Sequence, residues 1–159
     1  MNRTTPHPLL VEYLQTLISQ LAIPVNAKRI ALNFRVQSYY QSKEGFHPVE
    51  IQLERHTEDS KPLWRIVFIA SFSYPDEQAD NVEVELYFNF LRNWFYQPDI
   101  SRCNLHQPKV TELYAAYERS VMKQIKESGF DDIRASLVSI HNPPQSTLTT
   151  EPNSKRSPQ

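Results

Sequence analysis

The chain has 159 residues, of which 40% are hydrophobic and 11% aromatic, enough for one domain to bury a core without metal or disulfide staples. Its 17 basic and 18 acidic residues give a net charge of −1, which excludes the strongly basic footprint of a general DNA or RNA binder. A single cysteine, Cys103, excludes an intrachain disulfide.

The first predicted element is a helix that begins near Pro8, a residue suited to the first helical turn. Apolar residues recur at three- and four-residue spacing as far as Leu21, and Pro24 ends the pattern. Residues 1–7 are predicted to be flexible. Because the early apolar residues are periodic and not continuous, the sequence predicts no signal peptide and no transmembrane helix. We therefore expect a cytoplasmic protein without a membrane partner.

The period then changes to two residues, which is typical of strands with one solvated face. Four segments alternate in this way, at 29–37, 48–54, 64–74 and 82–90. Gly45 lies in the turn between the first two, where we expect it to supply a positive φ angle. Four successive strands with short turns predict an antiparallel meander. In the third strand, the alternate residues from Trp64 to Tyr74, including Ile66, Phe68 and Ala70, are expected on one face, with Val67 and Ile69 on the other.

Residues 91–108 show no period and are predicted to be irregular. Residues 109–127 return to the helical period, and the last turn contains two lysines. Gly129 stands where a left-handed glycine often ends a helix. The alternation around Ala135 then predicts a fifth strand.

These elements together predict a single α+β domain over residues 8–141. It is an antiparallel sheet of about five or more strands, flanked by an N-terminal and a C-terminal helix, with one helix on each side. Residues 142–159 are rich in Pro, Ser and Thr and hold few apolar side chains, which predicts a disordered tail.

Motifs for the common catalytic and cofactor chemistries are missing from the sequence. The chain has only 2 glycines, too few for a glycine-rich phosphate loop, and it contains no Gly-x-Ser-x-Gly elbow. Cys103 and His106 form one imperfect ligand pair, with His47 and His56 elsewhere, whereas a structural zinc site normally has two close pairs. We therefore expect no catalytic residue, no cofactor and no metal site.

An acidic run from Asp76 to Glu85 contains five carboxylates and no basic residue. Converging carboxylates bind hard cations, but the spacing fits no calcium-loop pattern. We interpret Glu83 and Glu85 as the solvated face of a strand.

Aromatic residues outside the predicted strands are the most distinctive binding candidates. Aromatic side chains in loops can anchor a protein interface, stack on bases or close an open end of the core. Two polar residues join them: His47, before a proline at the entry to the second strand, and Glu50, on the polar face of that strand. The alternative to a binding role for His47 is a turn residue whose side chain hydrogen-bonds to backbone. The possible binding surface comprises Tyr39, Tyr40, His47, Glu50, Trp94, Phe95 and Tyr96.

Several stretches resemble an uncharacterised bacterial family, the domain of unknown function 2787. The most specific is Gly45-Phe46-His47-Pro48-Val49-Glu50-Ile51. Three weaker stretches extend the resemblance over about 40–140; they are Trp64-Arg65-Ile66, Leu86-Tyr87-Phe88-Asn89-Phe90 and Glu112-Leu113-Tyr114. In the family pattern, acidic residues alternate with the phenylalanines of the fourth strand, where this chain has Tyr87 and Asn89. A tryptophan is common in the family where Tyr117 stands.

The resemblance implies a fold like that of the mitochondrial glycoprotein family of acidic matrix proteins, an antiparallel sheet with an N-terminal and a C-terminal helix. Those relatives form ring-shaped trimers that bind many proteins, and genes of the bacterial family are often associated with genomic islands. The resemblance therefore implies a homo-oligomeric binding protein with no established activity or catalytic residue.

Three functional hypotheses follow. The first is a non-catalytic protein-binding or scaffold domain that self-associates and has an unknown protein partner. The second is an enzyme or small-ligand receptor with a pocket between sheet and helix, lined by Tyr39, Trp94 and Tyr114. The third, which the charge balance does not favour, is a nucleic-acid accessory protein, and it requires four basic residues to share one face. These are Lys28, Arg29, Arg35 and Arg55.

Overall fold

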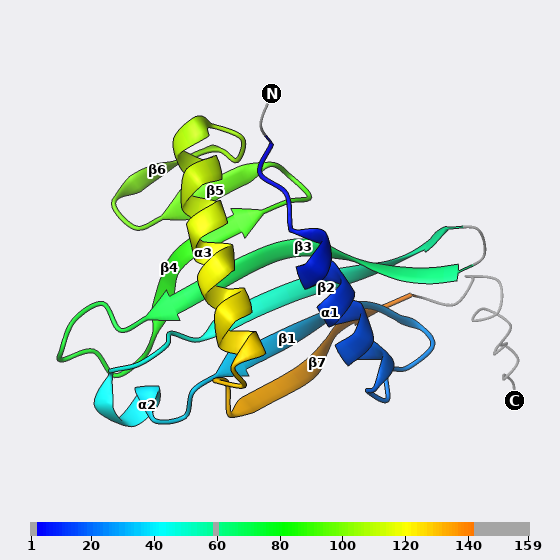
Figure 1. Ribbon diagram of the computed structural model, residues 1–159, viewed down its shortest axis with the longest axis horizontal. Coiled ribbons are helices and arrows are strands. Elements are labelled where there is room, and N and C mark those ends of the chain that lie inside the picture. The colour runs from blue at the N-terminus through cyan, green and yellow to red at the C-terminus, as the bar shows by residue number, and fades with distance from the viewer. Residues whose placement is uncertain (1–2, 59–60, 142–159) are drawn as a thin grey trace, which may run out of the picture.

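A seven-stranded antiparallel sheet is the framework of the computed structural model, which describes residues 3–58 and 61–141 (Figure 1). Its strands are β1 (Ala27–Arg35), β2 (Val49–Glu58), β3 (Lys61–Ser73), β4 (Glu83–Asn89), β5 (Trp94–Gln97), β6 (Ile100–Asn104) and β7 (Asp132–Ile140). The helices are α1 (Pro8–Ser19), the short α2 (Tyr39–Ser42) and α3 (Pro108–Lys126). The predicted α+β fold with an N-terminal and a C-terminal helix is confirmed.

The strand order β6-β5-β4-β3-β2-β1-β7 contains the predicted meander. Strands β1 to β6 are neighbours in chain order, and β7 returns to pair with β1. Residues 91–108, predicted to be irregular, instead contain the β5–β6 hairpin. Its strands have 4 and 5 residues, too short for an alternating pattern to be recognised. The free edges of the sheet are β6 and β7.

The helix α3 crosses the whole sheet because it connects these two edges. Its 19 residues measure about 28 Å at about 1.5 Å per residue, and the sheet is about 29 Å wide at about 4.8 Å per strand spacing. The helix therefore reaches from one edge to the other, and Figure 1 shows it passing over the strands. Neither α3 nor any other helix in the described ranges combines the length and the apolar character that crossing a membrane requires.

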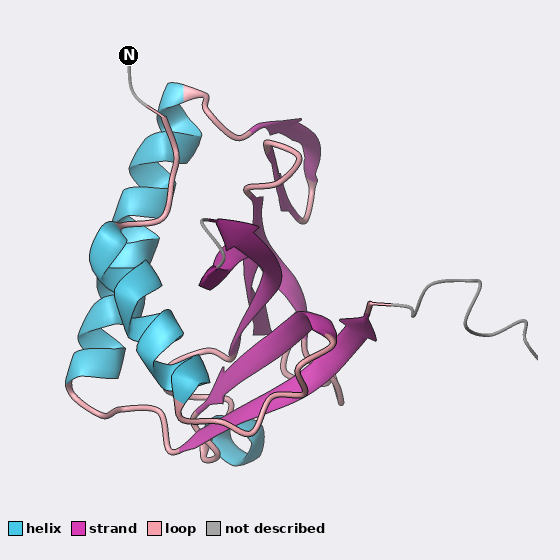
Figure 2. Cartoon of the chain, turned by 90° about the vertical axis from the view of Figure 1, so that its right-hand side faces the viewer, coloured by secondary structure: helices cyan, strands magenta, loops and turns pink. Residues whose placement is uncertain are grey.

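Both long helices lie on the same face of the sheet, and not one on each side as expected (Figure 2). Leu14 of α1 and Val110 of α3 belong to one buried cluster with alternate strand residues such as Leu32 and Ile51. The strand residues between them, such as Asn33 and Gln52, are only partly buried. Covering the apolar face of the sheet removes apolar surface from water and stabilises the fold, so both helices pack there.

A buried carboxylate joins the two helices. Glu118 on α3 is only 8% exposed, and its Oε2 accepts hydrogen bonds from the Tyr114 hydroxyl and from the backbone N–H of His7, each at 2.7 Å. His7 is the N-cap of α1, where the helix dipole favours a negative charge. Glu118 therefore fixes the start of α1 against the middle of α3.

The segment before α1 also contacts α3. Thr4 lies in the N-terminus predicted to be flexible, yet it is 2% exposed. Its backbone N–H donates to His106 Nδ1 at 3.0 Å, and its hydroxyl donates to the Leu105 carbonyl at 2.7 Å. Residues 3–7 are thus held at the start of α3. Residues 1–2 and the tail predicted at 142–159 lie outside the described residues.

The two glycines occupy different structural environments. Gly45 adopts φ +112°, as predicted. At the end of α3, however, the left-handed residue is Ser128, with φ 56°, and not Gly129. The N–H of Gly129 donates to the Gln124 carbonyl at 2.8 Å, and a Cβ atom at Gly129 would lie 2.3 Å from the Gln124 side chain. A larger residue at position 129 would therefore require the flexible end of the Gln124 side chain to move.

The Glu118 contacts generate a stability prediction. We expect Glu118→Gln to lower the free energy of unfolding by about 1–2 kcal/mol, because a neutral amide is a weaker acceptor for the Tyr114 hydroxyl and the His7 N–H. Urea denaturation measures the change. Glu112→Gln, an exposed glutamate on the same helix, is the matched control and should leave the midpoint unchanged. Equal midpoints for both variants would contradict the bridging role of Glu118.

Candidate functional site

The predicted binding residues fall in three places. Glu50, Trp94 and Tyr96 project from the side of the sheet opposite α1 and α3, which we call the helix-free face. Ala70, which pairs with Glu50, and Asn89, which pairs with Trp94, lie on the same face. Phe95 points the other way and lies in the core, 3% exposed. The remaining three residues lie at a corner of the domain, near α2. They are Tyr39, Tyr40 and His47.

An aromatic row, formed by Phe68, Tyr87 and Trp94, crosses the helix-free face. Successive ring centroids are 4.7 and 4.8 Å apart, with interplanar angles of 29° and 22°. The Arg102 guanidinium lies 4.7 Å from the centroid of the Trp94 ring. Because β3, β4 and β5 each contribute one ring and β6 contributes Arg102, the spacing of the strands sets the spacing of the stack. The rings are half-buried and Arg102 is exposed.

Phe68 was missed as a site residue because a β-bulge in β3 reverses its expected face, and Tyr87 was interpreted only as a residue of its strand. The pairing shifts so that Gln52 faces Phe68 while Leu53 faces Ile66, and Val67 is the extra residue. Trp64 and Ile66 therefore point to the helices, whereas Phe68 and Ala70 point to the helix-free face. The strict alternation predicted for 64–74 is wrong beyond the bulge. A local sequence pattern carries no signal for it.

Amide side chains surround the aromatic row. Asn89 donates to the Tyr87 hydroxyl at 3.2 Å and accepts the backbone N–H of Arg92 at 2.7 Å. On β2, Gln52 donates to Glu50 at 2.8 Å. Tyr87 and Asn89 are the positions where the family pattern stated above has acidic residues, so the chain presents neutral polar groups on this face in their place.

An ion-pair network occupies the same face on β1, β2 and β3. Glu54 accepts a hydrogen bond from Arg29 at 3.0 Å and lies 3.5 Å from Arg65. Burial alone would raise the pKa of Glu54, but the hydrogen bond and charge of Arg29, together with Arg65, lower it below its ordinary value. The charge of Arg29 is therefore matched within the sheet.

The basic residues of the nucleic-acid hypothesis do not share one face. Arg29 lies on the helix-free face, paired with Glu54. Arg55 lies on the helix side, where it is 4.7 Å from the centroid of Trp64 and donates to the carbonyl groups of Pro24 and Val25. The sheet separates these two guanidinium groups, so the four basic residues do not form one surface for a phosphate backbone.

A second polar cluster lies at the α2 corner. The Nδ1 atom of His47 is 2.7 Å from Oε2 of Glu85, and the Ser71 hydroxyl donates to the same oxygen at 3.0 Å. The Tyr39 ring lies 4.9 Å from the imidazole. His47 thus bonds to a carboxylate. The turn interpretation had assumed a hydrogen bond to backbone instead. In a nucleophilic triad the histidine stands next to the serine, whereas here the carboxylate stands between them.

Glu85 does not lie on the solvated face expected for it. Ser71 pairs with Leu86 and Phe72 pairs with Val84, so Glu85 is the extra residue of a β-bulge in β4. The bulge turns its carboxylate toward Ser71 and the helix side. Burial raises the pKa of the Tyr117 hydroxyl, and the charge of Glu85 raises it further. Glu83 remains exposed.

The side chains of the pocket hypothesis lie apart. Tyr39 is 2% exposed, with its hydroxyl accepting the Tyr74 N–H at 3.2 Å, and Tyr114 is 3% exposed in the core. Trp94 lies on the helix-free face, so these three rings do not line one cavity. The described pockets lie elsewhere, at the loop after α1 and in the groove between α1 and α3.

The residues considered for metal binding also have separate contacts. Cys103 is half-buried and packs against the core. His106 accepts the Thr4 N–H, and burial lowers its pKa, with the charge of Arg3 adding to the effect. Within residues 3–58 and 61–141, no three His, Cys, Asp or Glu side chains are grouped as metal ligands.

Comparisons with known proteins agree with the fold. A family model described as "Protein of unknown function (DUF2787)" matches residues 8–136. The solved structure of hypothetical protein VC0508, from the VSP-II pathogenicity island of Vibrio cholerae, has a TM-score of 0.72 at 21% identity, covering 87% of this chain and 97% of that chain. No curated protein matches the sequence.

A second solved structure is that of the conserved hypothetical protein VC1805, from pathogenicity island VPI-2 of Vibrio cholerae. It has a TM-score of 0.63 at 26% identity and covers 86% of this chain and 98% of that chain. It is described as sharing structural homology with the human P32 protein. The resemblance noted from the sequence is therefore confirmed for family and for fold.

The lowered pKa of Glu54 predicts a pH-dependent contribution to stability. Because the folded pKa lies below the unfolded value near 4.5, the ion pairs stabilise the protein above that pH and lose their effect as pH falls through the folded pKa. We expect Glu54→Gln to lower the free energy of unfolding by about 0.5–1 kcal/mol at neutral pH and by less at about pH 3, below the unfolded pKa. Denaturation at both pH values checks this, with Glu83→Gln as an exposed control. A pH-independent loss would refute the ion-pair explanation.

Proposed function

We propose that this chain, which belongs to the DUF2787 family of proteins of unknown function, is a non-catalytic protein-binding or scaffold domain that self-associates. The observation that carries the proposal is the helix-free face, with its aromatic row next to an exposed arginine. Tryptophan, tyrosine and arginine are the residue types that contribute most to binding energy in protein interfaces. The similarity to two proteins of pathogenicity islands supports a gene carried on a genomic island.

The geometry of the aromatic row favours a protein partner over a nucleobase or another planar ligand. Trp94 has Tyr87 on one side and Arg102 on the other, so both faces of its ring are already in contact. A base needs a free ring face on which to stack. The row offers ring edges, a hydroxyl and a guanidinium, which are groups that contact protein side chains and backbone.

Two further observations support a non-catalytic, self-associating protein. The polar cluster at the α2 corner has the carboxylate between serine and histidine, an arrangement that does not activate the serine. The resemblance to the mitochondrial glycoprotein family, with the described homology of VC1805 to human P32, supports self-association. We place the protein in the cytoplasm, where the free thiol of Cys103 stays reduced.

Site-specific photo-crosslinking tests partner binding. A photo-reactive residue at Tyr96, which is 37% exposed on the helix-free face, should give discrete protein adducts in cells that produce the chain. The same residue at Glu112, exposed on α3, is the control and should give none of them. When Trp94→Ala is combined with the photo-reactive residue at Tyr96, the yield of adducts should fall by about tenfold, the usual scale for losing one interface anchor.

Two outcomes would contradict a partner on the helix-free face. One is the absence of protein adducts from Tyr96, and the other is an identical adduct pattern from Tyr96 and Glu112. Thermal unfolding of Trp94→Ala serves as a control, since reduced crosslinking counts only when the variant is folded at the temperature of the experiment.

Light scattering at several protein concentrations tests self-association. We expect a mass of at least two chains that falls on dilution, because association depends on concentration. A monomer over the whole range would contradict this part of the proposal and leave the crosslinking test of an outside partner unaffected.

A further inference from the structure

The two free edges of the sheet differ in their protection. Natural edge strands are protected from pairing with other chains by short length, proline, lysine or a covering segment. β6 has 5 residues and directly follows the turn at Pro98 and Asp99. β7 has 9 residues and contains neither proline nor lysine, and its one bulge, at Val138, leaves residues 133–137 regular. The edge at β7 is therefore long and open.

Apolar side chains line the helix side of β7. Ile133, Leu137 and Ile140 are 41%, 50% and 42% exposed. Ile133 pairs with Phe34 and Leu137 pairs with Ile30, two residues of β1 that are buried in the core. The apolar face of the sheet thus continues onto β7, where neither helix covers it. Such exposed apolar side chains in a row mark an interaction surface.

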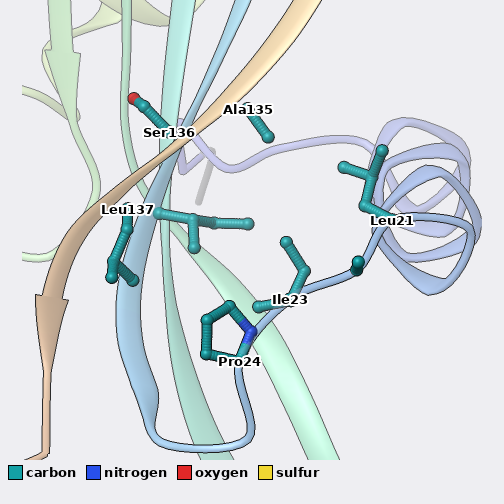
Figure 3. Close-up of a pocket in the computed structure, with 8 residues that line it drawn as sticks. Leu21, Ile23, Pro24, Ala135, Ser136 and Leu137 are labelled. Carbon is teal, nitrogen blue, oxygen red and sulfur yellow. The ribbon is translucent and has the colours of Figure 1, made fainter.

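An open apolar pocket of about 350 Å³ lies beside this row. In Figure 3, Leu21 and Ile23 of the loop after α1 lie across the pocket from Ala135 and Leu137 of β7. Ala22, Pro24 and Ile30 complete its apolar lining. A strand added at the β7 edge would place side chains next to this pocket.

We propose that β7 pairs antiparallel with β7 of a second copy of this chain, so that the two sheets join across a twofold axis. The inference rests on the self-association proposed above and assigns it a surface. A twofold interface uses the same surface on both copies, so the surface must be complementary to itself.

The sequence of β7 meets this requirement. When two copies pair antiparallel about Ala135, Ile133 lies opposite Leu137 of the second copy, and both residues are on the helix side. On the other side Arg134 lies opposite Ser136, so no like charges face each other directly. Arg134 is also 2.9 Å from Asp132 of its own strand, and β7 therefore carries no net charge that would repel a second copy.

The residues that follow β7 do not suit this edge. After His141 they continue with Asn142, Pro143 and Pro144, and proline cannot donate the backbone hydrogen bonds of a strand ladder. A second β7 contains no proline, so each backbone N–H that points outward from its edge can donate. The second copy is therefore the occupant that fits the edge.

Charged substitutions at the edge test the interface. We expect Leu137→Lys and Ala135→Lys each to raise the dimer dissociation constant by at least about tenfold, because the twofold axis places each new charge at the interface twice. The matched control is Ile100→Lys on β6, since Ile100 is 49% exposed and Leu137 is 50% exposed. Sedimentation velocity over a dilution series measures the dissociation constants, and thermal unfolding checks that each variant is folded.

The inference is supported if the wild type and the Ile100→Lys control are dimeric, while both β7 variants are folded and shifted toward monomer. A wild type that associates equally well with either β7 substitution overturns the β7 interface while self-association stands. A wild type that is monomeric at all concentrations overturns both. Dissociation by Ile100→Lys alone would assign the interface to β6 and overturn the inference as well.

Discussion

The architecture depends on one constraint, that a single helix joins the two edges of a seven-stranded sheet. α3 is about as long as the sheet is wide, so it spans all the strands and turns one stripe of side chains, including Val110, Tyr114 and Val121, toward them. Since α3 occupies the apolar face, α1 packs beside it and Glu118 connects the two. The opposite face is left without a helix.

The helix-free face has to be stable in contact with solvent. Its strands meet this requirement with side chains that contact one another, through the stacked row from Phe68 to Trp94 and through the Arg29–Glu54–Arg65 network. These contacts use ring faces and charges that a nucleic acid would need. What remains accessible beside the aromatic row is a surface of ring edges, amides and the Arg102 guanidinium, which is chemistry suited to a protein partner.

Local departures from regular strand geometry decide which side chains reach each surface. The bulge at Val67 moves Phe68 to the helix-free face, and the bulge at Glu85 moves a carboxylate to the helix side beside His47. Each bulge adds one residue to a strand, and because side chains alternate with a period of two, one residue is enough to exchange the faces. The two candidate sites therefore depend on two single-residue insertions in the ladder.

The sequence by itself determined the long helices, four of the strands in their meander and the positive φ of Gly45, because periodicity and backbone preference are local properties of the chain. Family membership also followed from the sequence, through the string from Gly45 to Ile51. Only the tertiary structure decided that both helices share one face, that β5 and β6 form a hairpin and that β7 is an open edge. It also decided that Phe68, Tyr87 and Trp94 stack. These features depend on the pairing and register of residues far apart in the sequence, and backbone hydrogen bonds formed on folding set that register.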